Sequence, residues 1–177
     1  MSSSEYLEKS IRNIPDFPKP GILFRDITTL LKDKKAFKLA VDEMIDIYKD
    51  KKIEKVVGIE SRGFILGAAV AYNLGAGFVL ARKKGKLPCE TRSVTYSLEY
   101  GTDTLEIHKD ALAKDERVLI VDDLMATGGT VGGVIDLVEQ FKAKIVGIAF
   151  VIELVDLKGN SKLKSYPYTS LVKFKGE

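Results

Sequence analysis

The sequence has little of the chemistry that metal centres and disulfide frameworks require, because its 177 residues include one cysteine and one histidine. A single cysteine cannot form a disulfide within the chain, and no cluster of cysteines and histidines offers ligands for a structural zinc ion. Cys89 is therefore interpreted as a reduced thiol in an intracellular protein. His108 matches no catalytic arrangement and is expected to be structural.

Long apolar runs and a strong charge imbalance are also absent. No stretch approaches the roughly 18 apolar residues that a membrane-spanning helix needs, and residues 1–10 lack the apolar segment of a secretory signal. We therefore expect a cytoplasmic protein without a membrane partner. The net charge of +3 is too small to indicate a dedicated nucleic-acid-binding protein, so no nucleic-acid partner is expected. A content of 45% hydrophobic and 30% charged residues is typical of a globular chain, and the length fits one domain.

Helical and strand patterns alternate along the chain. Residues 4–13 show near-helical spacing of apolar residues, and the three prolines and the glycine within 15–21 end that helix. Asp33 is a candidate N-cap for the next helix. The later elements are predicted as helix 36–49, strand 55–59, helix 64–73, strand 78–81, a hairpin over 93–107 turning at 100–103, strand 117–121, helix 130–141 and strands 144–152 and 170–174.

This alternation predicts an α/β fold in which a parallel sheet has helices on both faces. Ligands in such sheets bind beyond the carboxyl ends of the strands. The segments that follow Ile59, Ala81 and Val121 are therefore the first places to search for a site.

Residues 118–130 contain the strongest functional signal. A buried strand runs into Asp122 and Asp123, and the small residues Ala126, Thr127, Gly128, Gly129 and Thr130 follow before a helix begins. The glycines permit positive φ, so successive backbone N–H groups can point at one anion, and the helix N-terminus adds further donors. The pattern predicts a phosphate-binding loop. The chain has neither Gly-Lys-Ser/Thr nor a G-x-G-x-x-G after a strand, which excludes the nucleoside-triphosphate P-loop and the dinucleotide motif.

The two carboxylates beside this loop would repel a bare phosphate. They are explained by a sugar phosphate with vicinal hydroxyls chelated to Mg²⁺, since carboxylates accept hydrogen bonds from hydroxyls and coordinate Mg²⁺ directly or through water. The alternative interpretation is that Asp122 and Asp123 only cap a helix while the glycines form a tight turn.

The segment 118–130 resembles the phosphoribosyl-pyrophosphate motif of the type I phosphoribosyltransferase family. Four more segments resemble, in the same order along the chain, the members of that family that act on adenine: 20–27 (PGILFRDI), 60–64 (ESRGF), 82–88 (RKKGKLP) and 96–101 (YSLEYG). The resemblance covers nearly the whole chain. Cys89 stands where the family usually has glycine after Leu-Pro, and Glu60 stands where many members have Asp.

The resemblance implies an enzyme of purine salvage that transfers a 5-phosphoribosyl group from phosphoribosyl pyrophosphate to adenine, giving AMP and pyrophosphate. It also implies Mg²⁺ as cofactor, held mainly by the substrate, with Asp122 a candidate ligand through water. The implied architecture is a homodimer of single-domain subunits, each with an N-terminal hood (about 1–32), a parallel α/β core (about 33–155), a C-terminal extension (156–177) and a flexible hairpin over the active site.

The family's functional residues transfer onto matched positions of this sequence. The resemblance implies 5′-phosphate binding by Ala126–Thr130 and ribose binding by Asp122 and Asp123. The implied pyrophosphate ligands are Arg82, Lys83, Lys86 and Ser61, and the implied adenine contacts are Leu23, Phe24, Arg25 and Arg62. In the family the loop at 60–63 also contains an unusual cis peptide. From sequence alone there are three alternatives: the basic run is a solvated face, Arg62 forms a surface ion pair, and Phe24 packs in the core.

Glu99 is the implied catalytic residue, and Tyr100 is expected to help loop closure. A carboxylate there can accept the N9 proton of the purine or stabilise positive charge, which is worth roughly 10²–10⁴-fold in rate. An exposed hairpin carboxylate is the alternative. Two other functions stay open: transfer to hypoxanthine, guanine or xanthine, and a non-enzymatic sensor that retains the sugar-phosphate site.

Overall fold

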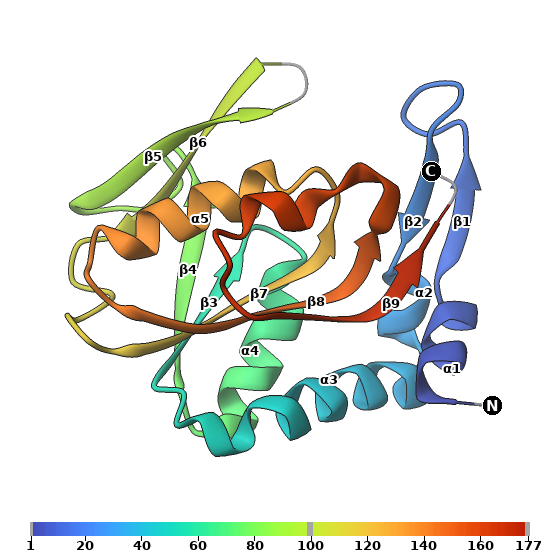
Figure 1. Cartoon of the computed structure of the whole chain (residues 1–177), viewed down its shortest axis with the longest axis horizontal. Helices are drawn as coiled ribbons and strands as arrows, with labels where there is room; N and C mark the ends of the chain where they lie inside the picture. Colours follow the sequence, from blue (N-terminus) through green and yellow to red (C-terminus); the bar gives the residue numbers. More distant parts are fainter. Residues whose placement is uncertain (1, 99–100, 176–177) are drawn as a thin grey trace.

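The central element of the computed structural model is a seven-stranded sheet with the order β5-β6-β4-β3-β7-β8-β9 (Figure 1). The structure describes residues 2–98 and 101–175. Strands β3, β4, β7, β8 and β9 run parallel, as predicted, while β6 pairs antiparallel with β4 and β5. The strands are β3 (Lys55–Ile59), β4 (Gly77–Lys83), β5 (Thr91–Leu98), β6 (Gly101–His108), β7 (Arg117–Met125), β8 (Lys144–Leu154) and β9 (Tyr168–Phe174).

Helices cover both faces of this sheet, as the alternation of elements predicts. One face packs against α3 (Lys34–Tyr48) and α4 (Gly63–Leu74), and the other packs against α5 (Gly129–Glu139). Asp33 is the N-cap of α3, where its Oδ1 accepts hydrogen bonds from the amides of Lys35 and Ala36 at 2.8 and 2.9 Å. Short 3₁₀ turns follow α3 and β8 at Lys49–Lys51, Val155–Leu157 and Gly159–Lys162.

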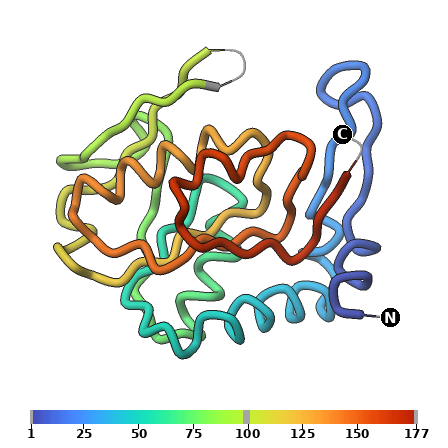
Figure 2. The backbone as a smooth tube through the Cα atoms, viewed as in Figure 1, coloured from blue at the N-terminus to red at the C-terminus, as the bar shows by residue number. Residues whose placement is uncertain are grey.

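The N-terminal residues form a small second layer beside the sheet. It consists of α1 (Ser3–Ser10), β1 (Arg12–Pro15), β2 (Leu23–Asp26) and α2 (Thr28–Lys32), and β1 pairs antiparallel with β2. Figure 2 shows α1 next to the last strand, where the Ser4 hydroxyl donates to the Leu171 carbonyl at 2.9 Å.

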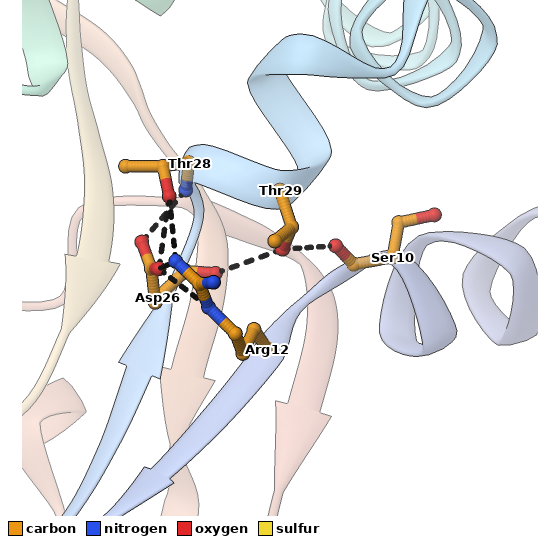
Figure 3. A network of polar contacts seen from close by, with 5 residues as sticks. All are labelled: Ser10, Arg12, Asp26, Thr28 and Thr29. Atoms are coloured by element: carbon orange, nitrogen blue, oxygen red, sulfur yellow. Dashed lines mark hydrogen bonds and ion pairs between the residues drawn. The ribbon is translucent and has the colours of Figure 1, made fainter.

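A polar network holds β1, β2 and α2 together (Figure 3). The Arg12 guanidinium donates to Asp26 Oδ2, with 3.0 Å from Nε, and the amide of Thr28 donates to Asp26 Oδ1 at 2.9 Å. The Thr29 hydroxyl donates to the Ser10 carbonyl at 2.7 Å. The Thr28 amide and the Arg12 side chain together lower the pKa of Asp26 to about 2.

Three sequence predictions need correction in detail. The helix predicted over 4–13 ends at Ser10, because Arg12–Pro15 pair with β2 instead. Gly101–Asp103, predicted as a turn, belong to strand β6, since Leu98 pairs with Gly101 and Tyr96 with Asp103. The strand predicted over 117–121 continues through Met125, so Asp122 and Asp123 lie in β7 rather than after it. Within the described part of the chain, no helix has the length and apolarity to cross a membrane.

Candidate active site

A pocket of about 360 Å³ lies at the carboxyl ends of β3 and β7. In Figure 1 the β5–β6 hairpin and the β1–β2 layer rise on opposite sides of this edge of the sheet. The pocket is lined by Glu60, Ser61 and Arg62 after β3 and by the continuous run Asp122–Val131. The structure therefore brings the predicted phosphate loop, both aspartates and three residues of the 60–64 segment into one cavity.

The loop between β7 and α5 is shaped by close backbone contact with a second glycine. Gly128 has φ +78°, and a Cβ atom built on it would lie 2.3 Å from the carbonyl oxygen of Gly159. A Cβ on Gly159 would in turn lie 2.2 Å from the Ala126 carbonyl oxygen. Only glycine fits either position, and α5 starts directly at Gly129, so its N-terminal donors face the pocket.

Asp122 and Asp123 sit in surroundings that disfavour their charge. The chain around Asp122 desolvates its carboxyl group and the neighbouring Asp123 carries like charge, so the pKa of Asp122 lies well above its ordinary value. Burial also raises the pKa of Asp123, which is 3% exposed, although the Arg62 guanidinium opposes that rise. Arg62 Nε lies 2.6 Å from Asp123 Oδ2.

Arg62 after β3, and Arg82 and Lys83 at the end of β4, are each paired with a carboxylate of the chain. Arg82 donates from Nε and Nη2 to both carboxylate oxygens of Glu60, at 3.2 and 3.1 Å, and from Nη1 to the Lys86 carbonyl at 3.2 Å. Glu60 also accepts the amide of Lys83 at 2.9 Å. These contacts, with the Arg82 side chain foremost, hold the pKa of Glu60 below its ordinary value. The Glu60–Ser61 peptide is cis, as the resemblance implies.

Lys83 and Lys86 are exposed at the rim of this region, and Lys83 Nζ lies 3.1 Å from Asp103 Oδ2 on β6. The carboxylates Glu60 and Asp103 were not among the predicted site residues. Their partners lie 22 and 20 positions away along the chain, so only the sheet register could have identified them.

The predicted adenine contacts lie on β2 and at the start of α4. The Phe24 ring packs edge-on against Phe17, with centroids 5.2 Å apart, and the Arg62 guanidinium carbon lies 5.5 Å from the Phe24 ring centroid. Leu23 is half-buried beside it on β2. Arg62 thus bridges Asp123 of the pocket and Phe24 of the N-terminal layer.

Arg25, the fourth predicted adenine contact, interacts with Phe174 and Asn13. Its guanidinium carbon lies 4.0 Å from the Phe174 ring centroid, its Nη1 donates to Asn13 Oδ1 at 2.7 Å, and the residue is 7% exposed. Its adenine role stays a prediction. Glu99 and Tyr100 lie outside the described residues, so their roles stay predictions as well.

Comparison with known proteins agrees with this geometry. The family model for the phosphoribosyl transferase domain matches residues 28–175. A protein of Clostridium kluyveri named adenine phosphoribosyltransferase is 58% identical over 168 residues, which is 95% of this chain and 98% of that protein. The chain belongs to the adenine phosphoribosyltransferase family.

Solved structures of adenine phosphoribosyltransferases share the whole fold. The crystal structure of the enzyme from Thermoanaerobacter pseudethanolicus superimposes with a TM-score of 0.93 at 50% identity, covering 97% of this chain and 99% of that one. The Trypanosoma brucei enzyme, in complex with AMP, pyrophosphate and ribose-5-phosphate, gives a TM-score of 0.90 at 26% identity, covering 97% of this chain and 79% of that one.

Proposed function

We propose that this protein transfers the 5-phosphoribosyl group of phosphoribosyl pyrophosphate to N9 of adenine, forming AMP and pyrophosphate in purine salvage. The supporting observation is the single pocket that combines a glycine-shaped anion loop with two carboxylates at strand ends. A sugar phosphate matches this combination, because its phosphate accepts amide donors while its hydroxyls donate to carboxylates.

The two sides of the pocket have different tasks in this proposal. Ala126–Thr130 bind the 5′-phosphate through backbone amides and hydroxyls, while Asp122 and Asp123 accept hydrogen bonds from the ribose hydroxyls. Pyrophosphate is bound by Ser61, Arg82, Lys83 and Lys86, where the guanidinium fork of Arg82 matches phosphate oxygens and the lysines supply point charges. Fixing both ends of the substrate holds C1′ where adenine can attack it.

Adenine is assigned to the side of the pocket that faces β2. The Phe24 ring supplies a flat face for the purine and the Leu23 backbone reads its edge. Arg25 supports β2 through its contacts with Asn13 and Phe174. Arg62, which lies between Phe24 and Asp123, orients the base relative to the ribose. This arrangement favours adenine over a sensor role, since a sugar-phosphate sensor needs no base site.

In the reaction the C1′–oxygen bond to pyrophosphate breaks and the C1′–N9 bond forms. The N9 proton passes to the carboxylate of Glu99, which also stabilises the positive charge that develops on the ribose. Tyr100 helps the hairpin exclude water, since water at C1′ would hydrolyse phosphoribosyl pyrophosphate. Both residues are assigned by resemblance to the family.

The residues present fit Mg²⁺ that is bound through the substrate. Within residues 2–98 and 101–175, no group of three or more histidine, cysteine or carboxylate side chains could hold a metal ion. The carboxylates that line the pocket are Glu60, Asp122 and Asp123. Mg²⁺ commonly binds one or two carboxylates plus substrate phosphates and keeps several waters. Asp122 is the proposed protein contact, through water. When bound, the ion neutralises the charge of the departing pyrophosphate.

A homodimer is proposed as the working assembly. Ile65 and Tyr72 lie seven residues apart on one face of α4 and are 46% and 86% exposed. Exposed apolar side chains in helical register favour contact with a second copy. The cytoplasmic location stays a prediction from the sequence.

The decisive test is to incubate the protein with Mg²⁺, phosphoribosyl pyrophosphate and adenine and to quantify AMP. Parallel reactions with hypoxanthine, guanine and xanthine address the second candidate function. AMP formation at least 100-fold faster than any other nucleotide is expected; equal turnover of hypoxanthine would reassign the base, and no product with any base would favour the sensor.

Glu99→Gln tests the assignment of the proton acceptor. We expect kcat to fall by roughly 10²–10⁴-fold, because an amide cannot take the N9 proton, while the Kd for phosphoribosyl pyrophosphate changes little. The matched control is Glu90→Gln, which removes one negative charge from an exposed pair with Lys109. Unchanged kcat in Glu99→Gln would remove Glu99 from the mechanism.

A further inference from the structure

Asp103 of β6 reaches across the sheet to a residue that the proposed function assigns to pyrophosphate. Its Oδ2 lies 3.1 Å from Lys83 Nζ, and its Oδ1 accepts the amide of Thr104 at 2.8 Å. The Thr104 amide and the Lys83 ammonium hold the pKa of Asp103 below its ordinary value, so the carboxylate is charged at neutral pH. The Asp103 side chain is 25% exposed and the Lys83 side chain 60% exposed.

Tyr96 fixes Asp103 from the opposite strand. The two residues are directly paired in the β5–β6 register. A Cβ on Gly133 of α5 would lie 2.8 Å from Tyr96 Cδ1, so the absence of a side chain there lets the tyrosine ring pack on the helix backbone. The Tyr96 side chain interacts with Asp103, helping to lower the pKa of that carboxyl, and with Thr130 on its other side. A chain of contacts therefore runs from Thr130 in the phosphate loop through Tyr96 and Asp103 to Lys83.

We propose that Asp103 is an internal competitor of pyrophosphate for Lys83, kept in place by Tyr96. This inference rests on the proposed function, because it takes Lys83 as a pyrophosphate ligand. In this proposal pyrophosphate gains the full Lys83 charge only when the Lys83–Asp103 ion pair opens. Asp103 is a positioning residue, since it acts through Lys83 and has no assigned contact with the reacting atoms.

Loss of a competitor and loss of an ordinary structural contact should change the Kd for pyrophosphate in opposite directions. If Lys83 is bound to Asp103 for part of the time, the apparent Kd for pyrophosphate rises by the reciprocal of the fraction in which Lys83 is available. Removing the competitor should therefore tighten binding, by about 2- to 5-fold for an exposed ion pair. A contact that only orders Lys83 for its ligand would weaken binding when lost.

The experiment measures pyrophosphate binding by calorimetry in Mg²⁺ buffer for the wild type and Asp103→Asn. Asparagine retains the oxygen that accepts the Thr104 amide and removes the charge. We expect the Kd for pyrophosphate to fall 2- to 5-fold, while the Kd for AMP, which lacks pyrophosphate, stays the same. Glu90→Gln makes the same change in net charge at the exposed pair with Lys109 and should change neither Kd.

A double-variant comparison separates competition from simple repulsion between Asp103 and pyrophosphate. In a Lys83→Met background, Asp103→Asn should have no effect on pyrophosphate binding. A Kd that is unchanged or raised in Asp103→Asn, or a fall that persists without Lys83, would overturn the proposal. If Asp103→Asn does not fold, Tyr96→Phe replaces it: a lower Kd supports the proposal, and an unchanged or higher Kd refutes it. AMP formation by the wild type tests the proposed function separately.

Discussion

In the proposed function, the two ends of the substrate site bind phosphate groups in different ways; one is the β7–α5 loop inside the pocket, and the other is the end of β4 beside it. At the β7–α5 loop the donors are backbone amides, and their positions follow from the path of the chain past Gly159. At the end of β4 the donors are the cationic side chains of Arg82 and Lys83, and each is held by a carboxylate of the chain. In that proposal the first end is preformed, whereas the second exchanges its internal ion-pair partners for the ligand.

The carboxylates at the two ends also differ in how their charge affects the stability of the fold. Burial raises the pKa of Asp122 and Asp123, so their charge destabilises the folded state at neutral pH. Cationic and amide donors lower the pKa of Glu60 and Asp103, so their charge stabilises it. The acids beside the phosphate loop are therefore retained at a cost in stability, as expected of groups that serve a ligand.

Gly128→Ala should break the preformed end and have the largest effect. The new Cβ would meet the Gly159 carbonyl at 2.3 Å and would also occupy a positive-φ position, so the loop must move. Because loss of one well-placed backbone donor costs about 10²–10³-fold in rate, we expect kcat/KM to fall by at least ~100-fold.

Gly75→Ala is the matched control for this change. Gly75 has φ +66°, and nothing lies within 4 Å of a Cβ built there. It should lose about 1–2 kcal/mol of unfolding free energy through the backbone conformation alone and keep its activity. Equal kcat/KM in the two variants, measured with adenine and phosphoribosyl pyrophosphate, would refute a loop shaped by contact with Gly159.

Arg82→Met should weaken the exchangeable end with a smaller effect. The variant loses a charge-assisted contact with pyrophosphate, worth about 1.5–3 kcal/mol, so we expect KM for phosphoribosyl pyrophosphate to rise roughly 10- to 100-fold. KM for adenine should change little. Arg117→Met is the control, because Arg117 also donates to a backbone carbonyl, that of Lys51, at 2.8 Å, but lies at the start of β7. A similar rise in both variants would exclude a specific role for Arg82.

The same contrast explains what the sequence alone could predict. The position of the 126–130 loop in the pocket was predictable because its strand, acids, small residues and helix are contiguous over 118–130. Asp33 as N-cap and the strand at 55–59 were predictable for the same reason, since capping and apolar runs are local signals. The close contact between Gly128 and Gly159 could not be predicted from the sequence, although a positive φ at a glycine of this loop was expected.

The features that pair distant residues could not be predicted. Glu60 with Arg82 and Asp103 with Lys83 depend on the register of three strands, which no local pattern specifies. The helix predicted over 4–13 ends earlier, at Ser10, because pairing of Arg12–Pro15 with β2 outweighs helical periodicity. The hairpin turn was misplaced because Gly and Asp at 101–103 are typical of turns, yet they extend the β5–β6 ladder.

The smallest predicted effect is a change in Tm. Removing a carboxylate charge should raise the Tm at the β7–α5 end and lower it at the β4 end. Asp122→Asn should raise the Tm at pH 7 by a few degrees, because a neutral amide removes the cost of a desolvated charge and retains an oxygen for the Asp123 amide at 2.9 Å. Its activity should fall, since the amide is a poorer acceptor for ribose hydroxyls. The gain in Tm should shrink as pH falls, because wild-type Asp122 takes up its proton below its raised folded-state pKa.

Glu60→Gln should change the Tm in the opposite direction. The folded-state pKa of Glu60 lies below its ordinary value of 4.5, so its charge stabilises the fold above pH 4.5 and loses that effect as pH falls through the lowered pKa. The variant should therefore lower the Tm at pH 7 and match the wild type in strong acid. Thermal melts of both variants and the wild type between pH 3 and 7 would check this; shifts of the same sign at pH 7 would contradict the electrostatic difference between the two ends of the pocket.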